Sequence, residues 1–391
     1  MNKSDSFALS AVGRVRTENQ DRYLADRANG IYAVADGVGG APHGEAAAEA
    51  ALAAVSQRAR KGFASLPKPI APDDLRDLAR RCVEAAGDAV AAIAKRGGTH
   101  DGAATTLTVL LHHEACAAMA HVGDSRLYLY RQRRLEQLSV DHTVANELHR
   151  AGTMSPERAR RHPLRNVLSR SLGAGAGVEI DTLVLALAPG DIFLLATDGL
   201  NEAVDEVGVS HSASLPDNAR RLLERANALG GKDNATAVFI RIEDVAEDPR
   251  VRAVELLESV TPFAGLDLAS RSRVVGAAFL DTLAAGETLV RPHDALAGLV
   301  VVVEGRLAWT ADTSLELGPG SWFAEAALVG RARSPAHVSA TELTRVLVLS
   351  PERWNKLARR RPRVGVEVLR AIAAGGFARH GSAVVPHHGT R

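Results

Sequence analysis

The chain has 391 residues, of which 46% are apolar and 24% charged, so wholesale disorder, collagen-like repeats and coiled coil are poor descriptions of it. At the usual ~100 to 200 residues per domain, this length predicts two domains. Lysine and arginine total 47 against 46 aspartate and glutamate, and this near neutrality gives no overall field that would bind nucleic acid or an anionic membrane.

The cysteines and the apolar stretches indicate a compartment. Cys82 and Cys116 are the two cysteines, and neither has the spacing of a metal or redox site, so we expect buried free thiols in a reducing compartment. Residues 1–17 lack the continuous apolar core of a secretory signal. The longest apolar stretch, 295–303, is far shorter than the roughly 20 residues that span a bilayer. We therefore expect a soluble, cytoplasmic protein.

The first two thirds of the chain mix strands and helices. Short apolar or β-branched runs bounded by Gly, Asp or Asn predict strands. They lie at 31–35, 106–112, 116–122, 127–131, 192–196 and 235–242. An alanine-rich tract at 44–61 and a tract at 73–96, with apolar residues three and four apart, predict two helices. Because strands outnumber helices, an α+β fold of sheets covered by helices is favoured over a doubly wound parallel sheet.

The pattern changes near Glu243, where an acidic, polar stretch leads to Pro249. We place a domain boundary here, which gives a first domain of 1–245, a second of 246–375 and a disordered tail of 376–391.

The second domain reads as helices around a small β-roll. Helical segments at 251–259 and 267–279 precede strand-like runs separated by turn glycines, which are typical of such a roll. Helical stretches at 351–361 and 363–374 follow the roll and close the domain.

Four aspartates stand at strand ends, each beside Gly, Asn or Ser: Asp36, Asp124, Asp198 and Asp233. For any one of them, a simple turn is the favoured interpretation. Carboxylates at adjacent strand ends can converge, however, and they repel one another unless a cation holds them. Oxygen ligands select Mg²⁺ or Mn²⁺, and two such ions would activate water for a phosphoryl displacement.

The residues around these aspartates resemble, in order, the motifs of the metal-dependent protein phosphatases, the PPM or type 2C family, over residues 7–243. The matching segments are Arg16-Thr17-Glu18-Asn19-Gln20-Asp21, Val34-Ala35-Asp36-Gly37-Val38-Gly39-Gly40, Val122-Gly123-Asp124-Ser125-Arg126, Ala196-Thr197-Asp198-Gly199-Leu200 and Lys232-Asp233-Asn234-Ala235-Thr236. A further match, Ala103-Ala104-Thr105-Thr106-Leu107, is assigned only to packing. The resemblance implies a four-layer α-β-β-α sandwich that hydrolyses phosphoserine and phosphothreonine on proteins.

The resemblance also implies a metal site that holds two ions of Mn²⁺ or Mg²⁺, with a third, weaker ion in bacterial members. Its ligands would be Asp21, Asp36, Gly37, Asp124, Asp198 and Asp233. Asp36 would bridge both ions and serve catalysis, Gly37 would offer its carbonyl oxygen, and Asp124 would help to bind the third ion.

Three further positions bear on catalysis. Arg16 would hold the substrate phosphate, and Gln20 stands where the family often has Glu, which weakens a water-mediated metal contact. The general acid for the leaving alkoxide stays open between metal-held water and His43, for which a surface histidine is the favoured interpretation.

Residues 139–173 are similar to the mobile flap of bacterial members, and we expect this segment to gate the substrate. Its basic run at 158–162 is interpreted as a solvated face, with docking of the phosphoprotein as the alternative. A second basic run at 359–361 is also interpreted as a solvated face.

The segments Phe323-Ala324-Glu325-Ala326-Ala327-Leu328 and Ser334-Pro335-Ala336-His337-Val338 resemble a degenerate phosphate cassette of a cyclic nucleotide-binding domain, and the resemblance covers residues 253–374. Glu325 is retained and would hold a ribose hydroxyl, but Ser334 replaces the arginine that neutralises the cyclic phosphate, with Arg333 and Arg331 nearby. Loss of that arginine costs several kcal/mol in order of magnitude, and Pro335 removes a backbone donor. We expect weak or no cyclic nucleotide binding, and a role in dimerisation, autoregulation or partner docking.

The leading hypothesis is a protein serine/threonine phosphatase with a phosphorylated protein as substrate, a cognate Ser/Thr kinase as partner and a homodimer through the second domain. One alternative is a catalytically weak regulator that only binds a phosphoprotein, which Gln20 supports. Another is a cyclic nucleotide sensor with an enzymatic output.

Overall fold

The computed structural model describes residues 3–38, 43–96, 103–173, 177–311, 314–330 and 332–377. The chain divides into two compact units, Met1–Glu247 and Asp248–Arg391. The final helix ends at Phe377, and the rest of the predicted tail, 378–391, lies outside the described residues.

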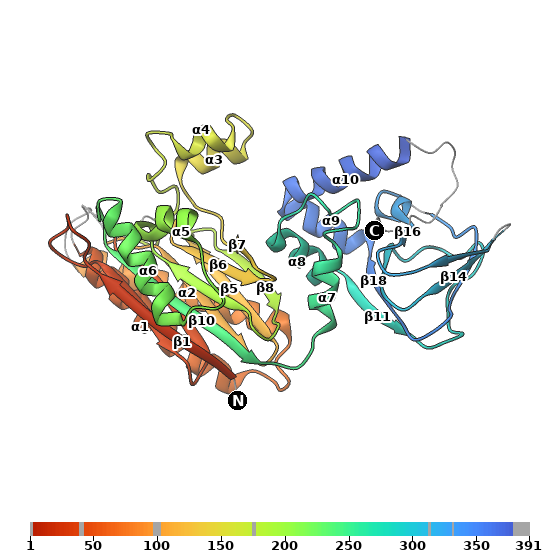
Figure 1. Ribbon diagram of the computed structural model, residues 1–391, viewed down its shortest axis with the longest axis horizontal. Coiled ribbons are helices and arrows are strands. Elements are labelled where there is room, and N and C mark those ends of the chain that lie inside the picture. The colour runs from red at the N-terminus through yellow and green to blue at the C-terminus, as the bar shows by residue number, and fades with distance from the viewer. Residues whose placement is uncertain are drawn as a thin grey trace. The chain divides into compact units, whose positions relative to one another are not determined.

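In the described part of the first unit, the strands form two five-stranded antiparallel sheets (Figure 1). One sheet has the order β1 (Lys3–Ala11), β10 (Ala235–Asp244), β9 (Ile192–Ala196), β6 (Arg126–Arg131) and β7 (Arg134–Gln137). The other has the order β2 (Asp21–Asp26), β3 (Ile31–Asp36), β4 (Leu107–His113), β5 (Cys116–Val122) and β8 (Asp181–Ala186).

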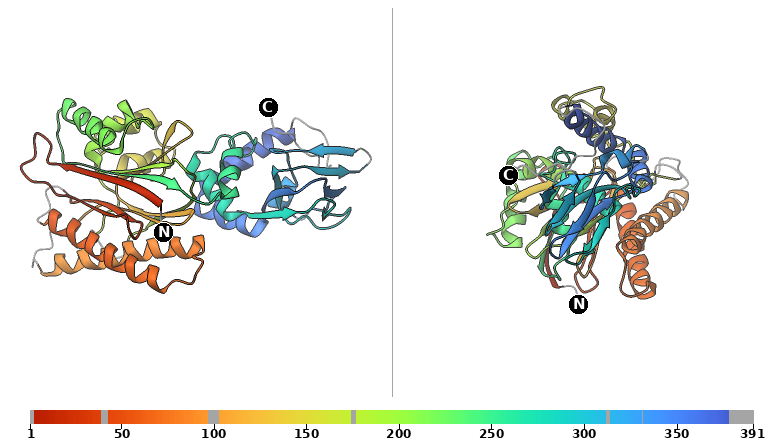
Figure 2. Two further views of the ribbon diagram at one scale, coloured as in Figure 1. Left: turned by 60° about the horizontal axis from the view of Figure 1, so that its bottom comes forward. Right: turned by 90° about the vertical axis from the view of Figure 1, so that its right-hand side faces the viewer.

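Helices cover the outer face of each sheet. The helices α1 (Gly44–Ser65) and α2 (Pro72–Arg96) pack on the sheet that contains β3, and α6 (Leu215–Ala228), next to α5 (Asn201–Val207), packs on the sheet that contains β10. Figure 2, left, shows these two helical layers, orange and green, on opposite sides of the strands. The predicted four-layer α-β-β-α sandwich is therefore confirmed.

Strand β3 shows why the sandwich strands are almost continuously apolar. Successive side chains of a strand point to opposite faces. Ile31, Ala33 and Ala35 pack into the cluster shared with α1 and α2, whereas Tyr32 and Val34 are fully buried on the other face. The hydroxyl of Tyr32 lies 3.2 Å from Ser4 Oγ on β1 of the facing sheet, so both faces of β3 are covered.

The second unit contains the predicted β-roll. After α7 (Pro249–Leu256) and α8 (Leu268–Ala277), its described strands form two four-stranded sheets. These are β11 (Phe279–Leu283), β18 (Thr344–Leu349), β13 (Leu299–Glu304) and β16 (Trp322–Phe323), then β12 (Thr288–Val290), β17 (His337–Ala340), β14 (Leu307–Thr310) and β15 (Ser314–Leu317). The helix predicted over 267–279 ends two residues earlier, because Phe279 already pairs with Val348 as the first residue of β11. The helices α9 (Pro351–Arg360) and α10 (Pro362–Phe377) complete the unit.

Both cysteines are buried and free, as predicted, and burial raises the pKa of the Cys82 thiol to about 12. No helix in the described part of the chain has the length and apolar run that a bilayer crossing needs.

Candidate metal centre and active site

The predicted metal ligands come together at one end of the sandwich. Asp21 opens β2 directly opposite Asp36, the last residue of β3. From the facing sheet, Asp198 follows β9 and begins the short 3-10 helix η1 (Asp198–Leu200), and Asp233 precedes β10. Asp124 follows β5. Both sheets thus contribute acids to the same end, as the strand-end positions predict.

Asp21 is the most deeply placed of these acids. Its side chain is buried, and Oδ2 accepts hydrogen bonds from Thr197 Oγ1 and Thr236 Oγ1, both at 2.7 Å. Burial raises its pKa to about 7; the two threonine hydrogen bonds oppose this, and the charges of Asp198 and Asp233 add to it. Neither threonine is predicted from the sequence as a site residue, although both stand inside the quoted motifs.

The other carboxylates also destabilise one another's charge. Burial and then the charges of Asp198, Asp21, Asp124 and Asp233 raise the pKa of Asp36 well above its usual range. Burial, followed by the charge of Asp198, likewise raises the pKa of Asp124. Asp36 and Asp198 are nevertheless only half-buried, so one edge of the crowded cluster opens to the solvent.

This cluster fits divalent cations. Among the described residues, Asp21 Oδ1 and Asp198 Oδ1 are buried without a hydrogen-bond partner, although a buried polar atom normally has one. In the same part of the chain, no three His, Cys, Asp or Glu side chains are already arranged to hold a metal ion by themselves. Mg²⁺ typically binds through one or two carboxylates and keeps several waters, so a preformed protein cage is not required.

The backbone around Asp36 is held by Thr105 and Thr106, to which sequence analysis assigned only packing. Thr105 Oγ1 donates to the Asp36 carbonyl at 2.8 Å, and the Asp36 N–H donates to Thr106 Oγ1 at 3.0 Å. Thr106 Oγ1 also lies 2.7 Å from Ser125 Oγ, beside Asp124. These hydroxyls therefore position the backbone of Asp36 and contact Ser125 beside Asp124, a role beyond the packing that was predicted for them.

Gly37 allows the chain to pass very close to the start of α1. A Cβ atom at Gly37 would lie 2.4 Å from the carbonyl carbon of Gly44. Gly39 and Gly40 of the same motif lie outside the described residues. His43 is exposed and adopts a left-handed conformation with φ of 76°, in keeping with the favoured interpretation of a surface histidine.

Arg16 lies at the site but pairs with a predicted metal ligand. Its Nη2 donates to Asp233 Oδ2 at 2.8 Å, and both side chains are about two fifths exposed, at 44% and 36%. A guanidinium carries five N–H donors, so this contact leaves donors for a phosphate.

Asn234 ties the Arg16 loop to Asp233. Its Nδ2 donates to the carbonyls of Val12 and Glu18, at 2.9 and 2.8 Å, and its Oδ1 accepts the N–H of Gln20 at 2.8 Å. The position of Gln20 is therefore fixed through its backbone.

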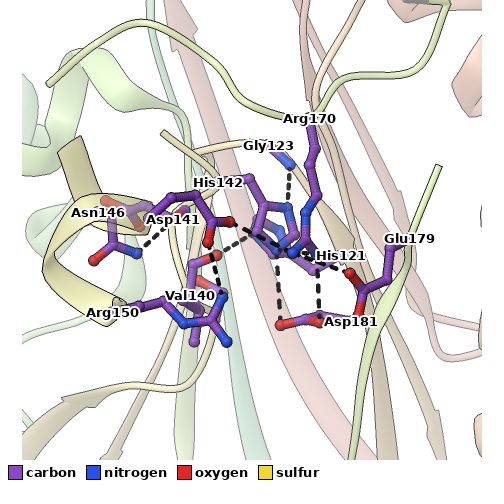
Figure 3. Close-up of polar contacts among 12 residues, drawn as sticks. His121, Gly123, Val140, Asp141, His142, Asn146, Arg150, Arg170, Glu179 and Asp181 are labelled. Atoms are coloured by element: carbon purple, nitrogen blue, oxygen red, sulfur yellow. Dashed lines mark hydrogen bonds and ion pairs between the residues drawn. The ribbon is translucent and has the colours of Figure 1, made fainter. Parts of the chain in front are cut away.

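The flap segment 139–173 follows β7, and its residue His142 is hydrogen-bonded to Gly123, the neighbour of Asp124 (Figure 3). The His142 N–H donates to the Gly123 carbonyl at 2.7 Å, and the Gly123 N–H donates to His142 Nδ1 at 3.1 Å. The other ring nitrogen, Nε2, lies 3.7 Å from Asp181 Oδ2 and 3.4 Å from Arg170 Nη1. Arg170, near the other end of the flap, places Nη1 3.9 Å from Asp181 Oδ1. Both ends of the flap are thus fixed on Asp181, beside the Asp124 loop.

In the cassette of the second unit, Ser334 and Arg333 are hydrogen-bonded to backbone groups of the same chain. Ser334 is buried, and its Oγ donates to the Ala336 carbonyl at 2.8 Å. The N–H of His293 donates to the Ser334 carbonyl at 2.7 Å, and Arg333 Nη1 donates to the His293 carbonyl at 2.6 Å. Glu325 begins the 3-10 helix η2 (Glu325–Leu328), whereas Arg331 lies outside the described residues.

Two family models match the chain. The model described as Protein phosphatase 2C matches residues 13–237, and the model described as Cyclic nucleotide-binding domain matches residues 280–361.

Relatives and solved structures match the first unit. The serine/threonine phosphatase Stp of Listeria monocytogenes is 32% identical over 235 residues, which cover 58% of this chain and 92% of that protein. The crystal structure of the Mycobacterium tuberculosis serine/threonine phosphatase PstP/Ppp is 32% identical and covers 62% of this chain and 99% of that chain, with a TM-score of 0.53. A structure of the PstP catalytic domain in complex with two manganese ions is 30% identical, covers 62% of this chain and 99% of that chain, and has a TM-score of 0.52.

The sandwich fold and its acidic end define the first unit as a phosphohydrolase of the α-β-β-α class. The chain belongs to the protein phosphatase 2C family, whose model spans more than half of its length. The predicted family, enzyme class and the fold of both units are confirmed, and the protein is a protein phosphatase with a phosphorylated protein as its substrate.

Proposed function

We propose that the first unit hydrolyses phosphoserine and phosphothreonine on proteins through Mn²⁺ or Mg²⁺ held at the acidic end of the sandwich. The buried carboxylate cluster, with its two unpartnered oxygens, carries this proposal. The names of the relatives and the two manganese ions in one relative support it.

Each acid has a proposed place in the centre. Asp36, Asp21, Asp198 and Asp233 and the carbonyl oxygen of Gly37 would hold two ions. Asp124 would contribute to a third, weaker ion. When bound, such ions lower the pKa of water and stabilise charge on the phosphoryl oxygens.

The chain's own residues would orient the phosphate. Arg16 lies at the exposed edge of the cluster, where its remaining N–H groups can bind phosphate oxygens. Asn234 holds the Arg16 loop through two backbone carbonyls, so the guanidinium is presented from a fixed loop.

A metal titration of the full chain tests this function. We expect phosphate release from a phosphothreonine peptide only with added Mn²⁺ or Mg²⁺, and none after chelation. The metal should also raise the melting temperature, because it binds the folded cluster and not the unfolded chain. Activity that survives chelation would contradict the mechanism, and unchanged melting would contradict the metal site. A regulator that only binds phosphoproteins would show the melting shift without turnover.

We propose that the second unit regulates or assembles the enzyme and does not sense cyclic nucleotides. The closed Ser334 loop and the contact of Arg333 with the His293 carbonyl support this role. Calorimetry of the full chain with cAMP or cGMP should show no saturable heat below about 1 mM, a Kd that corresponds to about 4 kcal/mol. Tight saturable binding would favour the cyclic nucleotide sensor instead.

Two partners complete the proposal. A cognate Ser/Thr kinase would generate the phosphoprotein substrate. A homodimer would form through the second unit, where Val366 and Leu369 of α10 are 45% and 38% exposed.

A further inference from the structure

The flap carries a concentrated positive charge. Between Leu148 and Arg170 the sequence has one acid, Glu157, against six arginines: Arg150, Arg158, Arg160, Arg161, Arg165 and Arg170. Four of these, which we call the flap arginines, are exposed: Arg158, Arg160, Arg161 and Arg165. They lie on and just after the short helix α4 (Pro156–Arg160).

The flap arginines differ from many arginines in the same unit. Arg60, Arg126 and Arg131 pair with acids at 2.6 to 2.7 Å. Among the residues that the structure describes, no flap arginine side chain forms a hydrogen bond or an ion pair, although the charge of Arg160 helps to lower the pKa of Glu157. Four cations on one segment therefore have no ion-pair partner within the described part of the chain.

The segment that presents these cations is anchored beside the active site. The α3 (Val144–Arg150) and α4 region begins at His142, which exchanges two hydrogen bonds with Gly123, the neighbour of Asp124. The Val144 N–H donates to the Val167 carbonyl at 2.9 Å, so the two arms of the flap are joined at its base. Figure 1 shows α3 and α4 standing out from the sheets of the first unit.

We propose that the flap arginines bind acidic segments next to the phosphorylated residue of the substrate. The inference rests on the proposed phosphatase function and names the substrate class as phosphoproteins whose phosphosites are flanked by Asp, Glu or further phosphates. Arginine binds carboxylate and phosphate with paired N–H donors, which matches this chemistry. Leu164 and Val167, exposed by 42% and 45%, supply apolar contact beside the charges.

Paired peptides test this specificity on the full chain with Mn²⁺. Two phosphothreonine peptides would differ only in acidic or uncharged flanks, and p-nitrophenyl phosphate would serve as a substrate without flanks. We expect kcat/KM to be about fivefold higher for the acidic peptide at low salt, mainly through KM. The difference should vanish at about 0.5 M NaCl, where screening acts within roughly 4 Å.

A double variant, Arg158→Ala with Arg161→Ala, should abolish the preference and leave p-nitrophenyl phosphate hydrolysis unchanged. The matched control, Arg58→Ala with Lys61→Ala, removes the same charge from exposed positions of α1 and should keep the preference. Equal rates on both peptides, or equal losses in both variants, would overturn the docking role while p-nitrophenyl phosphate turnover shows an intact phosphatase. Failure to hydrolyse any substrate would instead overturn the function on which the inference rests.

Discussion

Asp36→Asn is expected to abolish most phosphatase activity and, at the same time, to stabilise the metal-free protein. Loss of this proposed metal ligand should lower kcat/KM by about 1,000-fold, which corresponds to about 4 kcal/mol of transition-state stabilisation. The variant keeps the side-chain volume but removes a group whose charged form is disfavoured by burial and by the charges of Asp198, Asp21, Asp124 and Asp233. In chelator, the melting temperature should rise by about 2 to 4 °C for each kcal/mol gained.

A loss of activity together with a gain in stability distinguishes this result from simple unfolding, in which both would fall. Steady-state rates with Mn²⁺ and thermal melts with and without chelator measure both quantities. Asp88→Asn, at an exposed position of α2, is the matched control and should change neither. An Asp36→Asn protein that is inactive and less stable in chelator would show that Asp36 is structural and not a strained ligand.

Gly199→Ala is expected to damage activity and stability together. A Cβ atom at Gly199 would lie 2.0 Å from the carbonyl oxygen of Asn234 and 3.5 Å from the Cβ of Asp233, so the loops that carry Asp198 and Asp233 must separate. Such overpacking typically costs about 1 to 3 kcal/mol of folding free energy. A displacement of about 1 Å at reacting groups typically costs about 100-fold in rate. Denaturant unfolding and kcat/KM on a phosphothreonine peptide measure the two effects.

The matched control is Gly276→Ala. Gly276 lies inside α8, and a Cβ atom at this position would have no neighbouring atom of the described residues within 4 Å. Alanine is favoured over glycine in a helix by about 1 kcal/mol, so this variant should be fully active and no less stable. Wild-type activity in Gly199→Ala would mean that the loops at Asp198 and Asp233 adjust independently of each other.

The apolar strands were predictable because both of their faces are buried. The runs at 31–35 and 192–196 contain no charged or amide side chain that would indicate a loop. By contrast, β1 and β2 were not predicted, because their residues are mostly half-buried and polar, and what places them is pairing with partners distant in sequence. Helix α6 was missed although Ser214 accepts the Asp217 N–H as an N-terminal cap, followed by Pro216.

The aspartates were predictable from the site's own chemistry, but their supports were not. Several acids that recur at strand ends have few purely structural explanations. Threonines such as Thr197 and Thr236, by contrast, are common in any strand. Their hydroxyls become recognisable only when both sheets place them on Asp21. In the same way, only the structure shows that Arg16 contacts Asp233 and that the flap arginines have no ion-pair partners within the described part of the chain.

The pairing of β1 with β10 sets a time at which the enzyme can first act. Phe7 of β1 lies opposite Phe239 of β10, so this edge strand can pair only after the last strand of the first unit has been synthesised. Asp21 accepts a hydrogen bond from Thr236 of that same late strand, and Arg16 donates one to Asp233, which lies just before the strand. On the ribosome, Asp21 and Arg16 therefore lack their partners Thr236 and Asp233 for most of the synthesis of the first unit, and the site stays incomplete. Phosphatase activity begins only when β10 has emerged, however much metal the surroundings supply.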